Sequence, residues 1–306
     1  MTGLRALLAL AAASAAVGAA GRALTPQPTR WLTIDGRRVA VTETGEGPPI
    51  LLIHGLAGQA GNFHRLTPHL AGFRCIIPDR PGTGWSDPAA PGATGLSGHA
   101  ATAAALIEAM GTGPVLVVGH SLGGAIALRL ARDRPDLIAG LVGLGALTGP
   151  QVPQLAALGA DIGRKPLLRA GMVRLLGAPL APVMVPMFIA ATFGPEPMPP
   201  GFAVPGGIYA GLAPRMTAAL LRDLRGVAED TARLRTDLPD LRLPVTLLHG
   251  TEDRVLPVAQ HALPAALAIP DADLWLPHGG HMLPATQPEL VATAIRSTAT
   301  RAGMAP

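Results

Sequence analysis

The chain has little cysteine, little lysine and few charged residues. Its 306 residues include a single cysteine, Cys75, which excludes an intrachain disulfide. Charged residues make up 14% of the chain and hydrophobic residues 49%, a balance that excludes a disordered protein. Lys165 is the sole lysine, so arginine supplies nearly all the positive charge behind the formal net charge of +4. These arginines form no dense run with interleaved aromatics, which argues against a nucleic-acid surface.

A long, strongly apolar run is also lacking. Arg5 precedes an Ala/Leu-rich stretch at 6–20, the layout of a secretory signal, with candidate cleavage sites at 13–15 and 17–19. The stretch is short and weakly hydrophobic for a membrane span, which needs roughly 20 strongly apolar residues. We expect residues 1–24 to be a signal peptide or a membrane anchor, and the protein to be exported or membrane-anchored. An Ala-rich cytoplasmic extension is the alternative.

Beyond residue 24, strand-like and helix-like segments alternate, which predicts an α/β fold with a mostly parallel central sheet. The first two expected strands are joined by Asp35-Gly36, which is typical of a hairpin turn. Expected strands cover 31–34, 38–43, 50–53, 74–77, 114–119, 138–144, 245–249 and 273–276, and expected helices cover 64–70, 97–110, 122–130, 258–268 and 288–301.

The pattern changes between residues 148 and 238. This segment is rich in Pro, Met, Leu and Gly, and it shows no clean alternation. We interpret 148–238 as a cap lobe inserted between two parts of the core, 25–147 and 239–306. The alternative is a set of ordinary helices in a second core layer, which the proline density disfavours.

One serine lies between a buried strand and a helix. The apolar run 115–118 stops at Gly119-His-Ser121-Leu-Gly123, and apolar residues then recur with helical spacing. Gly-x-Ser-x-Gly in this setting predicts a nucleophile elbow, with Ser121 at the tip of a strained turn. Gly119 and Gly123 must be small because a Cβ there would collide with neighbouring backbone.

A serine hydroxyl needs a base, an acid that orients the base, and donors for the developing oxyanion. The base is expected on the loop after the last strand, where Gly279-Gly280-His281 stands. His278 is the competitor, because it lies closer to the strand end. The two glycines make a loop that can present an imidazole, which favours His281.

The acid is expected just beyond the preceding strand. Asp253 and Glu252 are the candidates in the turn that begins at Gly250. Asp253 is favoured because Gly-x-x-Asp places a short carboxylate at the strand end, whereas a solvated surface charge suits Glu252. The alternative position, after the strand that ends near Leu144, offers no carboxylate.

Backbone amides can bind the oxyanion. We assign one to the N–H of Leu122, directly after the serine. The other is assigned to the N–H of Leu56, in the glycine-punctuated turn 54–58 that follows a buried strand. His54 and His120 stand beside these groups, and for both a structural role is expected rather than catalysis.

Four motifs follow one another along the chain. They are His54-Gly-Leu-Ala-Gly58, Asp79-Arg-Pro-Gly82-Thr-Gly84-Trp-Ser86, Gly119-His-Ser121-Leu-Gly123, and the pair Asp253 and His281. With these motifs the chain resembles α/β-hydrolase-fold serine hydrolases of the esterase and lipase type, over residues 30–300. The order Ser, Asp, His matches that fold and differs from chymotrypsin-like and subtilisin-like proteases.

The resemblance has two further implications. Relatives that dehalogenate or open epoxides carry an aspartate at the nucleophile position, so Ser121 argues against those chemistries. The resemblance also implies that Asp79 and Ser86 stabilise a turn.

The expected activity is hydrolysis of an ester or related acyl bond through an acyl-enzyme on Ser121, with no metal or organic cofactor. The apolar cap predicts a hydrophobic small substrate. A membrane is the other expected partner, through the N-terminus. Six apolar residues of the cap could either line the pocket or pack within the cap: Met172, Met184, Met187, Phe188, Phe193 and Phe202. The candidate substrate-binding residues among them are Met184, Met187, Phe188 and Phe202.

Other activities share the same three residues. These are thioester, lactone or carbon–carbon bond hydrolysis, perhydrolysis and acyl transfer. A peptidase is disfavoured because no acidic group in the cap stands out as a binder of an amine terminus. A non-catalytic binding protein of the same fold is the alternative from another class, and the complete set of three residues counts against it.

Overall fold

The computed structural model of the chain describes residues 23–90, 93–149, 181–224 and 227–306, with scattered positions before residue 22; at 181–184, 212 and 228 it describes the backbone alone. Most of the predicted signal segment lies outside the described residues, and so does Met172. None of the helices in the described ranges is long and apolar enough to cross a membrane. The signal peptide or anchor stays a prediction.

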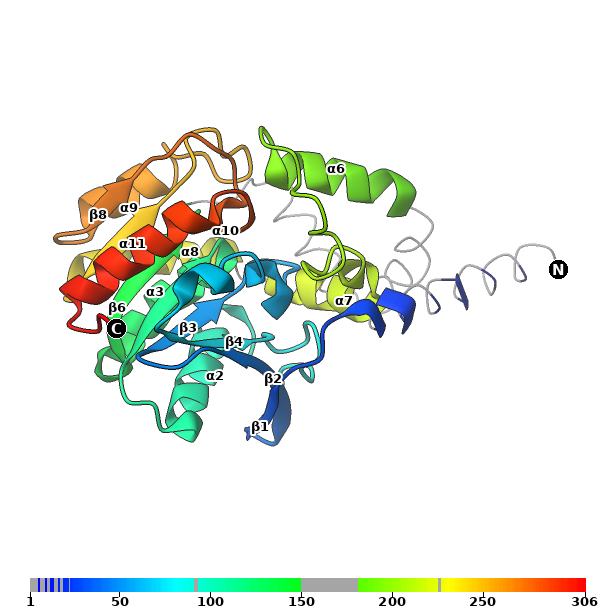
Figure 1. Cartoon of the computed structure of the whole chain (residues 1–306), viewed down its shortest axis with the longest axis horizontal. Helices are drawn as coiled ribbons and strands as arrows, with labels where there is room; N and C mark the ends of the chain where they lie inside the picture. The colour runs from blue at the N-terminus through cyan, green and yellow to red at the C-terminus, as the bar shows by residue number, and fades with distance from the viewer. Residues whose placement is uncertain are drawn as a thin grey trace.

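Eight strands form one sheet in the order β1-β2-β4-β3-β5-β6-β7-β8 (Figure 1). β1 and β2 form the predicted hairpin, and positive φ at Asp35 (49°) and Gly36 (71°) gives the backbone that a tight hairpin turn requires. β2 also pairs antiparallel with β4, and all other pairs are parallel, which confirms the predicted α/β fold. The strands are β1 (Arg30–Ile34), β2 (Arg37–Thr44), β3 (Pro49–Ile53), β4 (Arg74–Pro78), β5 (Val115–His120), β6 (Ile138–Leu144), β7 (Val245–Leu248) and β8 (Asp273–Trp275).

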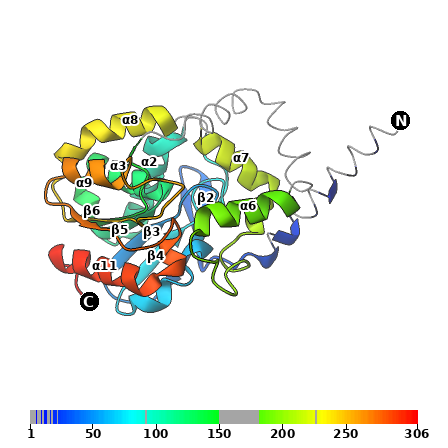
Figure 2. The same ribbon diagram turned by 90° about the horizontal axis from the view of Figure 1, so that it is seen from above.

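Helices cover both faces of the sheet (Figure 2). The central strand β5 is therefore buried along its whole length, and β3 is buried from its second residue on. Successive side chains of a strand point to opposite faces. Leu51 and Ile53 therefore pack under one helical layer, and Ile50 and Leu52 under the other. The first layer holds α2 (Gly95–Met110), α3 (Leu122–Asp133), α8 (Val227–Asp237) and α9 (Ala262–Ala268); the second holds α11 (Pro288–Arg301) and the 3-10 helices η1 (Ala60–Phe63) and η2 (Thr67–Leu70).

Three further α-helices, α6, α7 and α10, lie near the carboxyl edge of the sheet. α6 and α7 both lie on the same side of the sheet, to its right in both views (Figures 1 and 2). They belong to the segment predicted as a cap. Their bounds are α6 (Ala181–Phe193) and α7 (Pro214–Asp223), with η4 (Ala210–Leu212) between them and α10 (Leu283–Thr286) before α11; η3 (Pro135–Leu137) and η5 (Leu238–Asp240) are single turns.

The last helix of the predicted cap segment packs as part of the core. α8 contacts α2 and α3, and its Val227 and Leu234 are buried in the same apolar cluster as the sheet. Residues 227–238 therefore bury their apolar side against the first helical layer. The sequence does not show that packing against the core resumes at α8, because the preceding segment is proline-rich and low in charge.

Two predicted helices differ from those observed. The predicted helix over 64–70 is reduced to the 3-10 helix η2 over its last four residues, with residues 64–66 in a turn after η1. Pro68 stands in the first turn of η2, where its missing N–H costs no helical hydrogen bond. The helix predicted over 258–268 begins only at Ala262. His261 is its N-cap residue, and the ring of His261 accepts hydrogen bonds from the N–H groups of Thr148 and Gly149.

Replacing Leu234 by Ala tests the packing of α8. The side chain is 1% exposed, and we expect the Leu234→Ala variant to lose about 2–4 kcal/mol of unfolding free energy because it leaves a cavity. Urea denaturation followed by circular dichroism measures the loss. The matched control is Leu267→Ala on α9, where the side chain is 89% exposed and the change should be small. Equal losses in the two variants would contradict a core position for α8.

Candidate active site

The predicted site residues follow the carboxyl ends of four parallel strands. Leu56 follows β3, Ser121 follows β5, Asp253 follows β7 and His281 follows β8. These strand ends meet at one edge of the sheet, where open α/β sheets bind their ligands. The fold therefore gathers residues that are up to 225 positions apart in the chain (281 − 56).

Ser121 has the strained backbone that the motif predicts. Its φ of 57° and ψ of −120° lie outside the ordinary regions for a residue with a Cβ. The turn is held because Ser121 N–H donates to Leu144 O at 2.9 Å and Ser121 O accepts from the N–H groups of Gly124 and Leu147. A Cβ on Gly119 would overlap the backbone of Gly123, and one on Gly123 would overlap Ile53 O. β5, α3 and β3 approach that closely only with glycine at these positions.

Asp253 and His281 form a buried hydrogen bond. His281 Nδ1 lies 2.6 Å from Asp253 Oδ2, and the two side chains are 5% and 0% exposed. Burial raises the pKa of Asp253, but hydrogen bonds from His249, His281 and the Leu256 N–H outweigh it and hold the pKa below its usual range. Asp253 is therefore a carboxylate that fixes the proton of His281 on Nδ1, leaving Nε2 as the basic nitrogen.

His249 is a second histidine on the same carboxylate. Its Nε2 lies 2.6 Å from Leu256 O and 3.2 Å from Asp253 Oδ2. Asp253 Oδ1 accepts from the N–H groups of Val255 and Leu256 at 2.8 Å each. The carboxylate is thus held in one orientation from several sides. The sequence offers one clue to His249, its position four residues before Asp253.

The two competing candidates lie at the surface. His278 Nε2 is 3.4 Å from Glu252 Oε2, and the side chains are 83% and 40% exposed. The His278 side chain lies in water, and an ion pair with so exposed a partner holds the imidazole only weakly. The geometry supports the preference for Asp253 and His281.

His281 is connected to the elbow through His120. His120 Nε2–H donates to His281 O at 3.0 Å, and the two rings lie 4.9 Å apart. Ser121 Oγ and His281 make no hydrogen bond within the described residues. Such contacts often tighten only when substrate binds. His120 serves the structural role expected of it, because it ties the loop of the base to the residue before the serine.

The loop after β3 passes directly over the serine. A Cβ on Gly55 would lie 2.9 Å from Ser121 Cβ, so this position also requires glycine. Among the described residues, neither Leu56 N–H nor Leu122 N–H donates a hydrogen bond, since Leu122 is the first residue of α3. Both amides therefore keep an unpaired N–H among the described residues, as oxyanion donors require; their role as donors stays a prediction.

His54 and Asp79 hold this loop and its neighbour. His54 Nε2 accepts from Arg80 N–H at 3.1 Å, and its Nδ1 donates to Gly55 O at 3.0 Å. Burial, with Arg80 nearby, keeps the pKa of His54 well below 6.5. Asp79 accepts from the N–H groups of Ala60 and Trp85, and Ser86 Oγ donates to Asp79 O at 2.6 Å. The structural roles expected for His54, Asp79 and Ser86 are confirmed.

The candidate substrate-binding residues are scattered. Phe202 has no exposed surface, and its ring packs on Phe193 and His64, so it fills the base of the cap segment rather than lining a pocket. Phe193 and Phe202 pack on Met282, beside His281. Met187 and Phe188 on α6 are 67% and 45% exposed, and their contact with substrate stays a prediction. The side chain of Met184 lies outside the described residues.

Glu196 joins the cap segment to the loop that carries His281. Its Oε2 accepts from Gly280 N–H at 2.9 Å, and its Oε1 accepts from Gln287 Nε2 at 3.2 Å. Gly280 directly precedes His281. Among the described side chains, no group of three or more His, Cys, Asp or Glu could hold a metal ion.

The comparisons with known proteins agree with this architecture. The family model for the alpha/beta hydrolase fold matches residues 48–288, and the chain therefore belongs to the α/β-hydrolase family. With esterases and hydrolases among its relatives, the protein is a hydrolase of that family.

Three of these similar proteins cover most of the chain. A magnesium-chelatase 30 kDa subunit of Rhodobacter capsulatus is 31% identical over 84% of this chain and 86% of its own. A 2-hydroxymuconate semialdehyde hydrolase of Pseudomonas putida is 31% identical over 82% of this chain and 86% of its own. A thermophilic esterase from Thermogutta terrifontis, whose structure is solved, superposes with a TM-score of 0.73 at 26% identity, covering 89% of this chain and 98% of that one.

The pH dependence of stability tests the buried state of His120. Burial, with His281 nearby, lowers the pKa of His120 from 6.5 to about 3. The unfolded state therefore binds a proton between pH 6.5 and 3 that the folded state does not, so stability falls as the pH is lowered through this window. Replacing His120 by Gln removes this linkage and keeps a donor for His281 O. From pH 7 to pH 5 the variant should lose about 2 kcal/mol less stability than the wild type.

Urea denaturation at a series of pH values measures this difference. The control is His278→Gln, because that side chain is exposed, and its pH profile should follow the wild type. A His120→Gln profile parallel to that of the wild type would mean that His120 takes up its proton in the folded protein.

Proposed function

We propose that the protein is a serine hydrolase that cleaves a carboxylic ester or a related acyl bond of a largely apolar small molecule. The observation that carries the proposal is the buried Asp253–His281 hydrogen bond, at the same sheet edge as the strained Ser121. A carboxylate, an imidazole and a serine in this chain order match the hydrolases of this fold.

In this mechanism Ser121 Oγ attacks the carbonyl carbon of the substrate and His281 Nε2 takes its proton. Asp253 holds the other ring nitrogen and stabilises the imidazolium that forms. The amides of Leu56 and Leu122 bind the oxyanion, and the N-terminus of α3 adds the positive end of its dipole. The protonated His281 gives its proton to the leaving alcohol, and an acyl-enzyme remains. His281 then takes a proton from water as that water attacks the acyl carbon, and returns the proton to Ser121 Oγ as the bond between this oxygen and the acyl carbon breaks and the acid leaves.

The apolar character of the substrate rests on the cap segment. α6 carries no charged residue, and Met187 and Phe188 present apolar surface on it. Ligand pockets are lined mainly by apolar side chains with a few polar groups that fix orientation. An apolar acyl or alcohol group is therefore the portion that we assign to the cap. Thioesters, lactones and carbon–carbon bonds next to a carbonyl are the alternative substrates of the same residues.

A non-catalytic role is the second candidate function. The observation behind it is the relative named as a magnesium-chelatase subunit, whose likeness covers 84% of this chain. The available amides and the buried acid–base pair favour catalysis instead, because a binding protein needs neither.

Replacing Ser121 by Ala tests the proposed nucleophile. We expect wild-type protein to hydrolyse p-nitrophenyl esters of graded chain length. A fluorophosphonate probe should label wild-type protein at Ser121, which mass spectrometry of the labelled protein detects. The Ser121→Ala variant should lose about 10⁴-fold or more in kcat and should not be labelled. Thioesters and lactones assayed in parallel rank the substrate classes. Folded wild-type protein that neither turns over nor labels would support the binding role.

A paired comparison tests the acid and the base. Asp253→Asn keeps the shape but removes the charge, and His281→Gln removes the base, so each should lower kcat by about 10⁴-fold. Their surface neighbours provide matched controls, because Glu252→Gln and His278→Gln should stay within about threefold of wild type. If Glu252→Gln or His278→Gln instead causes the larger loss, the acid or the base has been assigned to the wrong residue.

A further inference from the structure

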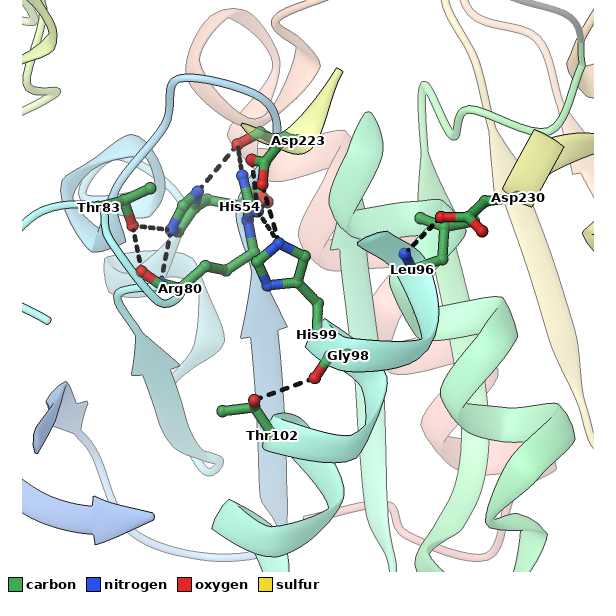
Figure 3. A network of polar contacts seen from close by, with 10 residues as sticks. His54, Arg80, Thr83, Leu96, Gly98, His99, Thr102, Asp223 and Asp230 are labelled. Atoms are coloured by element: carbon green, nitrogen blue, oxygen red, sulfur yellow. Dashed lines mark hydrogen bonds and ion pairs between the residues drawn. The ribbon is translucent and has the colours of Figure 1, made fainter. Parts of the chain in front are cut away.

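A buried charged cluster lies behind the loop that carries Leu56 (Figure 3). Arg80 follows β4, Asp223 is the last residue of α7, and His99 lies on α2. Arg80 Nη1 donates to Asp223 Oδ2 at 2.9 Å, and His99 Nε2 lies 2.9 Å from Asp223 Oδ1. All three side chains are 3–4% exposed. Asp223 thus meets two residues that precede it by more than 120 positions, in one water-excluded contact.

The cluster consists of one cation, one anion and a neutral imidazole. Burial raises the pKa of Asp223, but Arg80 and His99 outweigh it and hold the pKa below its usual range. Burial, opposed by the hydrogen bond to Asp223, lowers the pKa of His99. His99 Nδ1 has no hydrogen-bond partner among the described residues, so the single ring proton sits on Nε2, where it is donated to Asp223.

The rest of the Arg80 guanidinium faces the loop after β3. Its Nε donates to His54 O at 3.1 Å and its Nη2 donates to Gly55 O at 2.8 Å. Gly55 O also accepts from His54 Nδ1 at 3.0 Å and lies 3.2 Å from Gly58 N. One carbonyl therefore accepts three hydrogen bonds, of which one comes from a buried cation. Hydrogen bonds to a charged donor are shorter and stronger than neutral ones.

The carbonyl of Gly55 and the N–H of Leu56 belong to the same peptide unit. In a planar trans peptide these two groups point in opposite directions. Arg80 on the carbonyl therefore directs the Leu56 N–H away from the guanidinium, and Ser121 packs against Gly55 in the same turn. Polarisation along hydrogen-bonded groups also makes that N–H a stronger donor.

Fold stability alone does not account for such a cluster. A buried ion pair is often no better for stability than apolar side chains of the same volume, since both charges lose their hydration. Its distinct effect is geometric, because a guanidinium fork fixes several acceptors at once. In this protein the fixed acceptors are Asp223 in the cap segment and two carbonyls of the loop that carries Leu56.

We propose that Arg80 is the positioning residue of the oxyanion site, and that Asp223 couples α7 of the cap segment to that site by holding Arg80. The proposal rests on the serine-hydrolase function proposed above. Arg80 does not touch the reacting atoms; it acts through the Gly55–Leu56 peptide. The orientation of one oxyanion donor thereby depends on whether α7 is seated.

The test compares Arg80→Met and Asp223→Asn with a matched control. Asp230→Asn is the control, because Asp230 on α8 also accepts a backbone N–H, that of Leu96, but has no contact with the loop after β3 (Figure 3). The readouts are kcat and KM for the best p-nitrophenyl ester of the wild type, and Ki for a trifluoromethyl ketone of matching chain length. The ketone adduct of Ser121 carries an oxyanion, so its affinity reports on the oxyanion donors.

Arg80→Met should lower kcat about 10- to 100-fold with KM within about threefold of wild type, and should raise Ki by a similar factor, since loss of one oxyanion donor costs 10²–10³ in kcat. Asp223→Asn should change kcat and Ki in the same direction by a smaller factor. Asp230→Asn should stay within about twofold of wild type. Thermal unfolding checks that each variant is folded.

If Arg80→Met fails to fold, Arg80→Lys replaces it. Lysine keeps the cation opposite Asp223 but lacks the fork that reaches both carbonyls, so kcat should still fall about fivefold or more. A folded Arg80 variant with wild-type kcat and Ki overturns the proposal, as does a rise in KM alone or an Asp223→Asn effect no larger than that of Asp230→Asn. These outcomes leave the Ser121 mechanism intact, whereas wild-type protein without Ser121-dependent turnover overturns both proposals.

Discussion

The close approach of three backbone segments at Ser121 is the constraint on which the rest of the site depends. Gly119, Gly123 and Gly55 let β5, α3 and the loop after β3 come nearer than any side chain would allow. The strained φ of Ser121 persists because the neighbouring strand holds the turn, with Leu144 O accepting its N–H. Backbone packing therefore brings the serine, the first turn of α3 and the loop that carries Leu56 close together.

Near the serine, two buried aspartates are charged and three buried histidines are neutral. Asp253 and Asp223 accept enough hydrogen bonds to remain carboxylates, while burial keeps His54, His99 and His120 neutral. Neutral histidines serve as rigid donors and acceptors on the flanking loops. The two anions each face one partner that matters for the site, His281 for Asp253 and Arg80 for Asp223. In these two places the buried charge orients an imidazole or a peptide.

The sequence reveals those parts of the site that follow directly from a strand. Ser121, Asp253, His281 and Leu56 could be predicted because each stands just after a recognisable apolar run, and parallel strands end at a common edge. The Arg80–Asp223 pair could not, because its members are 143 positions apart and no local spacing links them. The burial of Phe202 and the core packing of α8 could not be predicted for a related reason. In a segment without regular periodicity, the sequence does not show which surface an apolar residue will pack against.

The described cap segment contacts both halves of the site. Asp223 at the end of α7 reaches the loop of Leu56 through Arg80, and Glu196, after α6, holds Gly280 next to His281. One contact concerns the groups that face a developing negative charge, and the other the loop that carries the base. Both join a carboxylate of the cap segment to the core, and neither involves the apolar side chains of α6. The apolar residues of the cap segment can therefore vary without breaking these two contacts.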